Sequence, residues 1–259
     1  MNKQDAKHLN KSKKVIMNKL LLSLSIASLS TAVFAGSGTQ WSYSGKKGPD
    51  NWAQLSADYY ACNGKSQSPV NLTGFIETDL TPIEFDYLAG GNEVLNNGHT
   101  IQVNYQAGSG IKLDGKTFEL KQFHFHAPSE NHIKGESFPL EAHYVHAASD
   151  GELAVVAVMF REGAKNEVLQ KAWKGMPKKA GEKIGLYENI QAANLLPDNK
   201  DYYRFTGSLT TPPCSEGVRW HVLKDSLEAS KEQIDLFTHT LGHDNNRPIQ
   251  SLNDREVLE

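Results

Sequence analysis

Two short stretches of the sequence hold the residues best suited to chemistry. They are Gln122-Phe123-His124-Phe125-His126 and, further along, Glu141-Ala142-His143. Because side chains two residues apart on a β-strand point to the same face, each stretch would present its polar residues together. If the two strands are neighbours, three imidazoles meet, and three imidazoles without a thiolate are typical of a catalytic zinc site with an open fourth position. The alternative is a set of ordinary half-buried histidines.

The segments that would position these histidines have the patterns of strands. Phe118–His126 and Leu140–His146 contain them, and the continuous apolar run Leu153–Phe160 predicts a central strand that is buried on both faces. Strict alternation of apolar and polar residues marks Ile101–Tyr105 as a half-buried strand. Further strands are expected at residues 83–87, 93–95, 111–113, 202–208 and 218–223, with a loop or loose hairpin at residues 127–138.

Helical patterns are few and lie outside these strands. The spacing of apolar residues predicts helices over Asn166–Lys174 and Ser226–Leu241, a short helix over Trp52–Tyr60, and a helical turn within Asn189–Leu196. The polar residues 64–72 are expected to form turns. The whole pattern predicts a β-dominated domain with a few surface helices.

The first 35 residues have the composition of a secretory signal peptide. A basic start precedes the apolar run Leu20–Phe34, and Ala35 offers a small residue for cleavage. Translation could begin at Met1 or at Met17, since the residues from Met17 onward already form a complete leader. The run is shorter than the ~20 residues of a membrane span, although an uncleaved anchor is the alternative. We therefore expect residues 1–35 to be removed and the mature chain to be periplasmic, with full secretion as the alternative and no membrane contact afterwards.

The remaining residues, 36–259, fit a single domain, because β-rich folds of this length commonly stay in one piece. The formal net charge of the chain is −3, and this near-neutral balance argues against a nucleic-acid partner. The chain has two cysteines, Cys62 and Cys214. Export to an oxidising compartment favours a disulfide between them over two free thiols.

Taken together, the motifs resemble those of the α-class carbonic anhydrases, in particular the exported bacterial members. The resemblance rests on the two histidine stretches, on Ser129-Glu130 and on residues 207–213, Gly-Ser-Leu-Thr-Thr-Pro-Pro. It is supported by Tyr43, by Gly64-x-x-Gln67-Ser68-Pro69, by Asn97-Gly98-His99 and by Arg247-Pro248-x-Gln250. The implied fold is mainly β, with a twisted central sheet of about ten mostly antiparallel strands and peripheral helices.

The resemblance implies reversible, zinc-dependent hydration of carbon dioxide to bicarbonate and a proton. His124, His126 and His143 match the zinc ligands. A water bound to zinc in such a site has its pKa lowered from 15.7 to about 7, so that zinc-bound hydroxide can attack carbon dioxide. Weak hydrolysis of activated esters is a further expectation, and bacterial relatives are often homodimers.

Other residues match the surroundings of the zinc site in that family. Gln122 and Glu141 match the side chains that hold two of the ligands, since a ligating imidazole usually donates its second N–H to a carbonyl or carboxylate. Thr210 and Glu130 match the pair that orients the hydroxide, and His99 matches the proton shuttle. The wall that receives carbon dioxide is matched by Val145, Val155, Leu209, Thr210, Thr211, Val218 and Trp220, and the polar wall that orders water by Tyr43, Asn97 and Gln102.

Two positions depart from the family pattern, and two other functions compete. Gln102 stands where many members have Asn, and Asn131 stands where they often have His.

The first competing function is a cupin-type site, in which Glu130 would be a fourth ligand to iron or manganese. The second is a catalytically silent binding module with the same fold. His146 is expected to be structural, and His239 and His243 are expected to lie on a solvated helix face.

Overall fold

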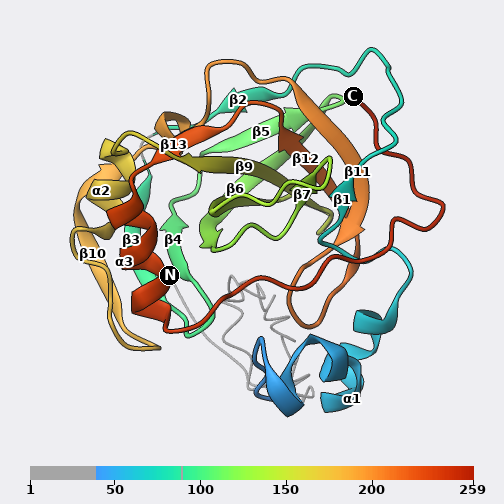
Figure 1. Cartoon of the computed structure of the whole chain (residues 1–259). Coiled ribbons are helices and arrows are strands. Elements are labelled where there is room, and N and C mark those ends of the chain that lie inside the picture. The colour runs from blue at the N-terminus through green and yellow to red at the C-terminus, as the bar shows by residue number, and fades with distance from the viewer. Residues whose placement is uncertain (1–38, 89) are drawn as a thin grey trace, which may run out of the picture. The chain divides into compact units, whose positions relative to one another are not determined.

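The computed structural model describes residues 39–88 and 90–259, without the side chains of residues 187–189. The dominant element is an 11-stranded sheet (Figure 1). Its strands are β2 (Glu84–Asp86), β3 (Gly91–Asn96), β4 (Ile101–Tyr105), β5 (Gly110–Leu113), β6 (Lys116–His126), β8 (Leu140–Ala147), β9 (Leu153–Glu162), β10 (Lys183–Ile190), β11 (Tyr202–Ser208), β12 (Glu216–Leu223) and β13 (Leu227–Ala229). The main path runs β10-β3-β4-β6-β8-β9-β12-β11. Among the described strands of this sheet, the only parallel pairs are β9 with β12 and β9 with β13, so the expected mostly antiparallel sheet is confirmed.

The alternation of side chains in the central strands separates two apolar clusters. In β9, the side chains of Val156 and Val158 belong to one cluster, and those of Val155 and Met159 belong to the other. All four are buried, as the continuous apolar run predicts for a strand covered on both faces. In β6, Phe123 and Phe125 pack into the first cluster, so their neighbours along the strand face the opposite side.

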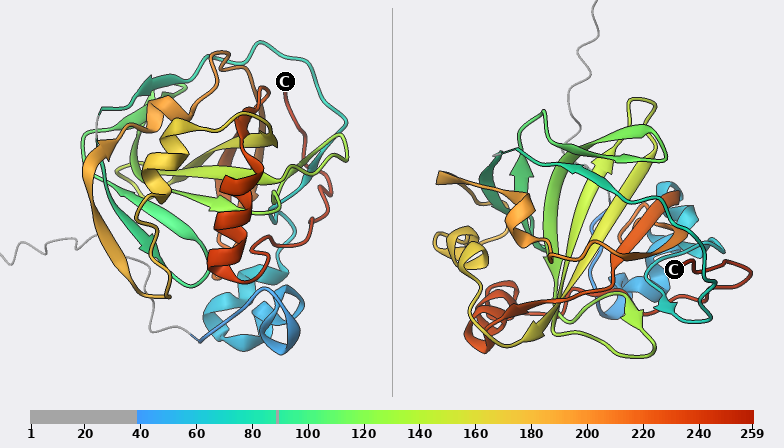
Figure 2. Two further views of the ribbon diagram at one scale, coloured as in Figure 1. Left: turned by 60° about the vertical axis from the view of Figure 1, so that its left-hand side comes forward. Right: turned by 90° about the horizontal axis from the view of Figure 1, so that it is seen from above.

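Two helices lie together at one side of the sheet, α2 (Glu167–Trp173) and α3 (Lys231–Leu241) (Figure 2). Asn166 caps α2 by accepting from two backbone N–H groups, and Ser230 and Gln233 form a capping box at the start of α3. Trp173 and Phe237 stack at 5.8 Å and join the two helices, and Phe237 also contacts Phe125 of β6. The helices therefore cover the aromatic face of β6.

The local structure differs from the expectations at four places. Residues 227–229 are not helical: they form the edge strand β13 beside β9, and the helix begins only after the Ser230 cap. The short helix expected at residues 52–60 is divided into α1 (Trp52–Leu55) and a 3-10 helix (Ala57–Asn63), because Ser56 is extended and caps the second segment. Strand β10 was not expected, since its pairing with β3 is interrupted by a bulge and its sequence lacks regular alternation. The expected turns and loop contain the small sheet of β1 (Asn71–Leu72) and β7 (His132–Ile133).

Cys62 and Cys214 form a disulfide with a sequence separation of 152 residues, as expected. They pack with Trp52 and Tyr59 in a small third cluster formed mainly by the N-terminal arm. No helix in residues 39–88 and 90–259 is long and apolar enough to cross a membrane. The predicted signal peptide lies outside the described residues.

Candidate metal centre

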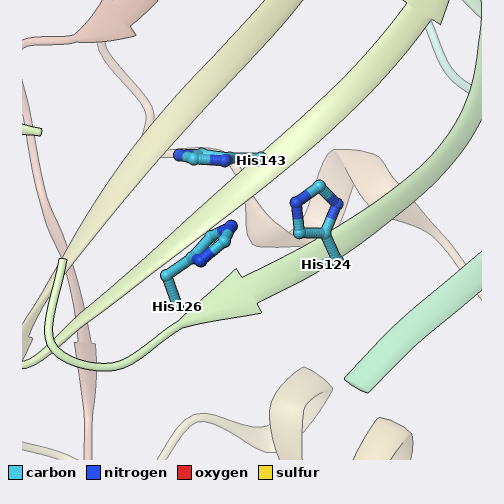
Figure 3. Close-up of side chains that lie close together, drawn as sticks. All are labelled: His124, His126 and His143. Carbon is cyan, nitrogen blue, oxygen red and sulfur yellow. The ribbon is translucent and has the colours of Figure 1, made fainter. Parts of the chain in front are cut away.

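The three histidines of the candidate site come from two paired strands. Strands β6 and β8 are antiparallel, and His124 lies directly opposite His143. A bulge at Lys121 shifts the register just before Gln122, and beyond it the strands pair without interruption to His126. One ligand atom from each of the three rings lies within 4.8 Å of the others, and the three rings lie close together at these two strands (Figure 3).

Each imidazole has one nitrogen engaged with the protein. His124 Nδ1 lies 2.8 Å from Gln122 Oε1, and His143 Nε2 lies 2.8 Å from Glu141 Oε1. His126 Nδ1 donates to the backbone carbonyl of Asn245 at 2.6 Å. Because each of these partners is an acceptor, the engaged nitrogen carries the proton and the second nitrogen keeps its lone pair. All three rings are thereby prepared to coordinate one cation.

The environment keeps two of the rings neutral. Burial, together with the neighbouring histidines, lowers the pKa of His124 well below its ordinary value and that of His126 to about 3. Burial also acts to lower the pKa of His143, but the Glu141 carboxylate outweighs it and the pKa is raised. Neutral imidazole is the form that binds a metal, so His124 and His126 need lose no proton at neutral pH.

The site has polar atoms that a cation would satisfy. His126 Nε2 and Glu130 Oε2 are buried, lie 3.4 Å apart, and have no hydrogen-bond partner among the described residues. Burial raises the pKa of Glu130 to about 7, although His143 and Thr210 oppose this shift. A cation at the three imidazoles would favour the carboxylate form of Glu130. Three imidazoles without a thiolate suit zinc with an open coordination position, so these residues fit the expected metal.

Glu141 is held firmly at the base of the site. One carboxylate oxygen accepts from the backbone N–H groups of Glu130 and Asn131, at 2.7 and 2.9 Å, and the other accepts from the Asn131 side chain at 2.8 Å. Burial acts to raise the pKa of Glu141, but the charge of His143 and these hydrogen bonds keep it lowered. Asn131 thus orients the carboxylate that faces His143.

A segment after α3 supports the site and contains a residue that the sequence analysis missed. Asn245 is fully buried, and its side chain bonds Ala127, Phe125 and the carbonyl of His99, in addition to the contact of its own carbonyl with His126. Two residues later, the Arg247 N–H donates to Glu130 Oε1 at 2.9 Å. The nearby Arg-Pro-x-Gln motif was the only sequence signal for this segment.

The buried guanidinium of Arg247 connects this segment to the disulfide region. It donates to the Gln67 side chain at 2.7 Å, to the Ser68 carbonyl at 2.9 Å and to the Cys62 carbonyl at 3.0 Å. Burial lowers its pKa to about 10, so the group remains charged at neutral pH. Arg247, whose backbone N–H bonds Glu130, therefore also contacts residues that lie far away in the sequence.

Five of the residues expected to form an apolar wall belong to one apolar cluster. Val155, Val218 and Trp220 are buried in one cluster, and the half-buried Val145 and Leu209 pack against it. The Trp220 ring meets His143 edge-on at 4.9 Å. Thr210 is buried, and Thr211 is half-buried after it. Through Trp220, this cluster reaches the candidate ligand His143.

The residues expected on the polar side have different partners. The Tyr43 hydroxyl is buried without a hydrogen bond to any described residue, and burial and the Glu130 charge raise its pKa. Gln102 lies opposite His124 on the neighbouring strand and donates to Asn104 at 2.7 Å. The Asn97 side chain accepts from the backbone N–H groups of His99 and Thr100, so it shapes the turn that carries His99.

His99 lies on the turn between β3 and β4 and stacks on Trp41. The ring centroids are 3.7 Å apart and the planes are 10° from parallel. Burial, with a smaller contribution from the charge of His243, lowers the pKa of His99 to about 4. In this position the imidazole is neutral at physiological pH.

Comparison with known proteins agrees with this arrangement. A family model described as eukaryotic-type carbonic anhydrase matches residues 47–259. A carbonic anhydrase from Pectobacterium carotovorum is 46% identical over 239 residues, which is 91% of this chain and 98% of that protein. A hyperthermostable carbonic anhydrase from an active hydrothermal vent chimney has a TM-score of 0.84 and 53% identity, covering 85% of this chain and 99% of its own. The α-carbonic anhydrase from Thermovibrio ammonificans in complex with the inhibitor sulfanilamide has a TM-score of 0.85 and 47% identity, covering 86% and 100%. On this evidence the chain belongs to the eukaryotic-type, or α-class, carbonic anhydrase family.

Proposed function

We propose that this chain hydrates carbon dioxide reversibly to bicarbonate and a proton, with zinc held by His124, His126 and His143. Hydration of carbon dioxide is the general reaction of the family to which the chain belongs. The observation that supports the zinc site best is the convergence of three imidazole nitrogens within 4.8 Å while the opposite nitrogen of each ring is held by an acceptor. Membership of this family argues against the cupin-type alternative.

In the proposed chemistry, the metal would supply a reactive water and the side chains would orient it. Zinc at such a site supplies a water whose pKa falls from 15.7 to about 7. The Thr210 hydroxyl has one hydrogen-bond donor, and we propose that it donates a hydrogen bond to Glu130, where it opposes the rise of the pKa that burial causes. The Thr210 oxygen can then only accept, so a reacting water must direct a proton towards it and a lone pair towards the substrate.

The apolar wall suits the substrate. Carbon dioxide is small and has no charge, so it needs a dry surface rather than an ionic contact. Val145, Val155, Leu209, Val218 and Trp220 would supply that surface beside His143, with Thr210 and Thr211 at its polar edge. Tyr43, Asn97 and Gln102 would face the water that leads to His99, the proposed proton shuttle. An accessible reactive water would also permit slow hydrolysis of activated esters.

The proposal is tested by stopped-flow hydration of carbon dioxide with the oxidised protein, before and after removal of zinc by a chelator. We expect fast hydration that falls as zinc is lost and returns when zinc is restored, in parallel with the zinc content measured by mass spectrometry. Sulfanilamide, which is bound as an inhibitor to the Thermovibrio ammonificans relative, should suppress it. Absence of hydration in a folded, zinc-loaded protein would instead favour the silent binding module.

We also propose that the chain is exported to the periplasm after cleavage behind Ala35. The disulfide supports this location, because such bonds persist in oxidising compartments. Fractionation of producing cells, followed by N-terminal sequencing, should find a periplasmic protein that begins at Gly36. A protein retained in the membrane with its leader intact would contradict the cleavage.

A further inference from the structure

His99 has an imidazole neighbour, His243, which comes from a distant part of the chain. Both rings lie against Tyr43: the centroid distance to Tyr43 is 5.9 Å for His243 and 6.4 Å for His99. The charge of His243 also contributes to the lowered pKa of His99, so the two rings lie close enough to interact electrostatically. We propose that His243 is a second proton-transfer residue, which passes protons between the Tyr43–His99 side of the site and the solvent.

The fold holds His243 at a defined position. Helix α3 ends at Leu241, and Gly242 adopts the left-handed conformation, with φ of 75°, that closes the helix. Two residues after His243, the buried Asn245 is anchored to Ala127, Phe125 and His126. His243 therefore lies between a helix cap and a fixed buried residue, and the expectation that it belongs to a solvated helix face is wrong because the helix ends before it.

The hydrogen bonding of His243 prepares its ring to accept a proton. Nδ1 lies 2.9 Å from the backbone carbonyl of Asp244, which can only accept, so Nδ1 carries the hydrogen. In the neutral ring the lone pair is therefore on Nε2. The side chain is exposed, so a proton received at Nε2 can pass to buffer.

The position of His99 explains why a second residue would matter. His99 is stacked on Trp41 and has a pKa of about 4. Transfer from a water of pKa about 7 to such a group is uphill by about 3 units, a factor of roughly a thousand in equilibrium. His243 is exposed, lies beside the Tyr43 ring, and has the Asp244 backbone carbonyl as the partner of its Nδ1. A route along the ring of Tyr43 to the exposed His243 avoids the stacked ring of His99.

The inference rests on the proposed function and is tested on the zinc-loaded, oxidised protein by exchange of ¹⁸O between carbon dioxide and water. This measurement gives the rate of interconversion of carbon dioxide and bicarbonate separately from the rate of proton transfer. The variants are His99→Ala, His243→Ala and the double variant. His239→Ala is the matched control, since His239 is an exposed histidine four residues earlier on α3.

We expect His243→Ala to slow proton transfer more than interconversion, and the double variant to slow proton transfer by about a hundredfold, the lower end of general acid–base contributions. Added imidazole should restore the rate, which loss of structure would not allow, and His239→Ala should behave as wild type. The inference would be overturned if His243→Ala transferred protons as fast as wild type and the double variant as fast as His99→Ala. Absence of interconversion in zinc-loaded wild type would overturn the proposed function, and this inference with it.

Discussion

The three candidate ligands differ in the residue that holds each ring. His124 faces an amide oxygen, His126 a backbone carbonyl, and His143 a carboxylate. Of these three partners, only Glu141 has a negative charge. It raises the pKa of His143, whereas the pKa values of His124 and His126 are lowered. The ring held by the carboxylate is therefore the most electron-rich ligand of the set, so Glu141 is the most informative of these partners to change.

Replacement of Glu141 should weaken the affinity for zinc. For Glu141→Ala we expect a loss of about 10–100-fold, the usual effect of removing a partner of a metal-ligating histidine. Glu141→Gln, which keeps an acceptor but removes the charge, should lose less. The measurement is competition for zinc with a chromophoric chelator at neutral pH. Unchanged affinity in Glu141→Ala would remove Glu141 from the metal site.

At the scale of elements, the end of α3 determines where the supporting segment begins. Gly242 has a positive φ of 75°, and its N–H donates to the Thr238 carbonyl. A residue with a Cβ carries a penalty of roughly 1–2 kcal/mol in this conformation, although Asn tolerates it better than Ala. The segment that follows holds His126 through Asn245 and Glu130 through Arg247.

Gly242→Ala should therefore reduce the free energy of unfolding by about 1 kcal/mol, and Gly242→Asn by less. No atom lies within 4 Å of the Cβ that either substitution adds, so the effect should come from the backbone. Urea unfolding of the two variants beside wild type measures the difference. Equal stability of all three proteins would show that the positive φ is not maintained.

The sequence predicted those parts of the site that depend on neighbours along one strand. Gln122 and His124, and Glu141 and His143, are two residues apart, so alternation alone brings each pair together. The third partner, Asn245, is 119 residues from His126 and acts through its backbone carbonyl. Every residue has such a carbonyl, so the residue type at position 245 gave no signal. In the same way, β13 is defined by its pairing with β9, and the helical pattern of the following residues obscured it.

At the scale of the whole molecule, the disulfide joins the N-terminal arm to the loop that contains Thr210. Cys214 N–H donates to the Thr211 carbonyl at 2.8 Å, and the Cys214 carbonyl accepts from Gln67. On the other side of the bridge, the Cys62 carbonyl accepts from Arg247. The bridge therefore restrains the ends of two segments that meet beside the candidate site.

The double variant Cys62→Ser/Cys214→Ser should lose about 2–4 kcal/mol of stability, a typical value for a native bridge. We also expect slower hydration of carbon dioxide at a temperature where the variant is still folded, because Thr210 and Glu130 lose a common restraint. Guanidinium unfolding and stopped-flow hydration check the two effects. Wild type treated with a reductant should approach the variant, and an unchanged unfolding midpoint would contradict the prediction.

Two buried histidines away from the metal centre should make the fold sensitive to acid. Burial lowers the pKa of His146 and of His221 to about 3. The unfolded chain binds a proton at each near pH 6.5, so between about pH 6.5 and 3 it holds more protons than the folded protein. The free energy of unfolding therefore falls as the pH falls, by up to about 1.4 kcal/mol per pH unit for each histidine.

His221→Leu should flatten this dependence by about one proton. His221 is the better choice because its Nδ1 is buried without a hydrogen-bond partner in the described part of the chain, whereas His146 bonds Tyr87 at 2.7 Å. Urea unfolding of both proteins at several values between pH 4 and 7, at the same zinc content, measures the slope. Parallel slopes for variant and wild type would contradict the prediction.

The alternation of β6 has a consequence for how the gene can change. His124 and His126 face the candidate site, while Phe123 and Phe125 are fully buried on the opposite side. Deletion or insertion of one residue between positions 122 and 126 would turn the residues on one side of the change to the opposite face, so that an imidazole enters the aromatic cluster or a phenyl ring enters the candidate site. The bulge at Lys121 shows that an extra residue is accommodated just before this stretch. Within it, only substitutions are open to evolution, because an in-frame insertion or deletion of one codon would disrupt the candidate site and the core together.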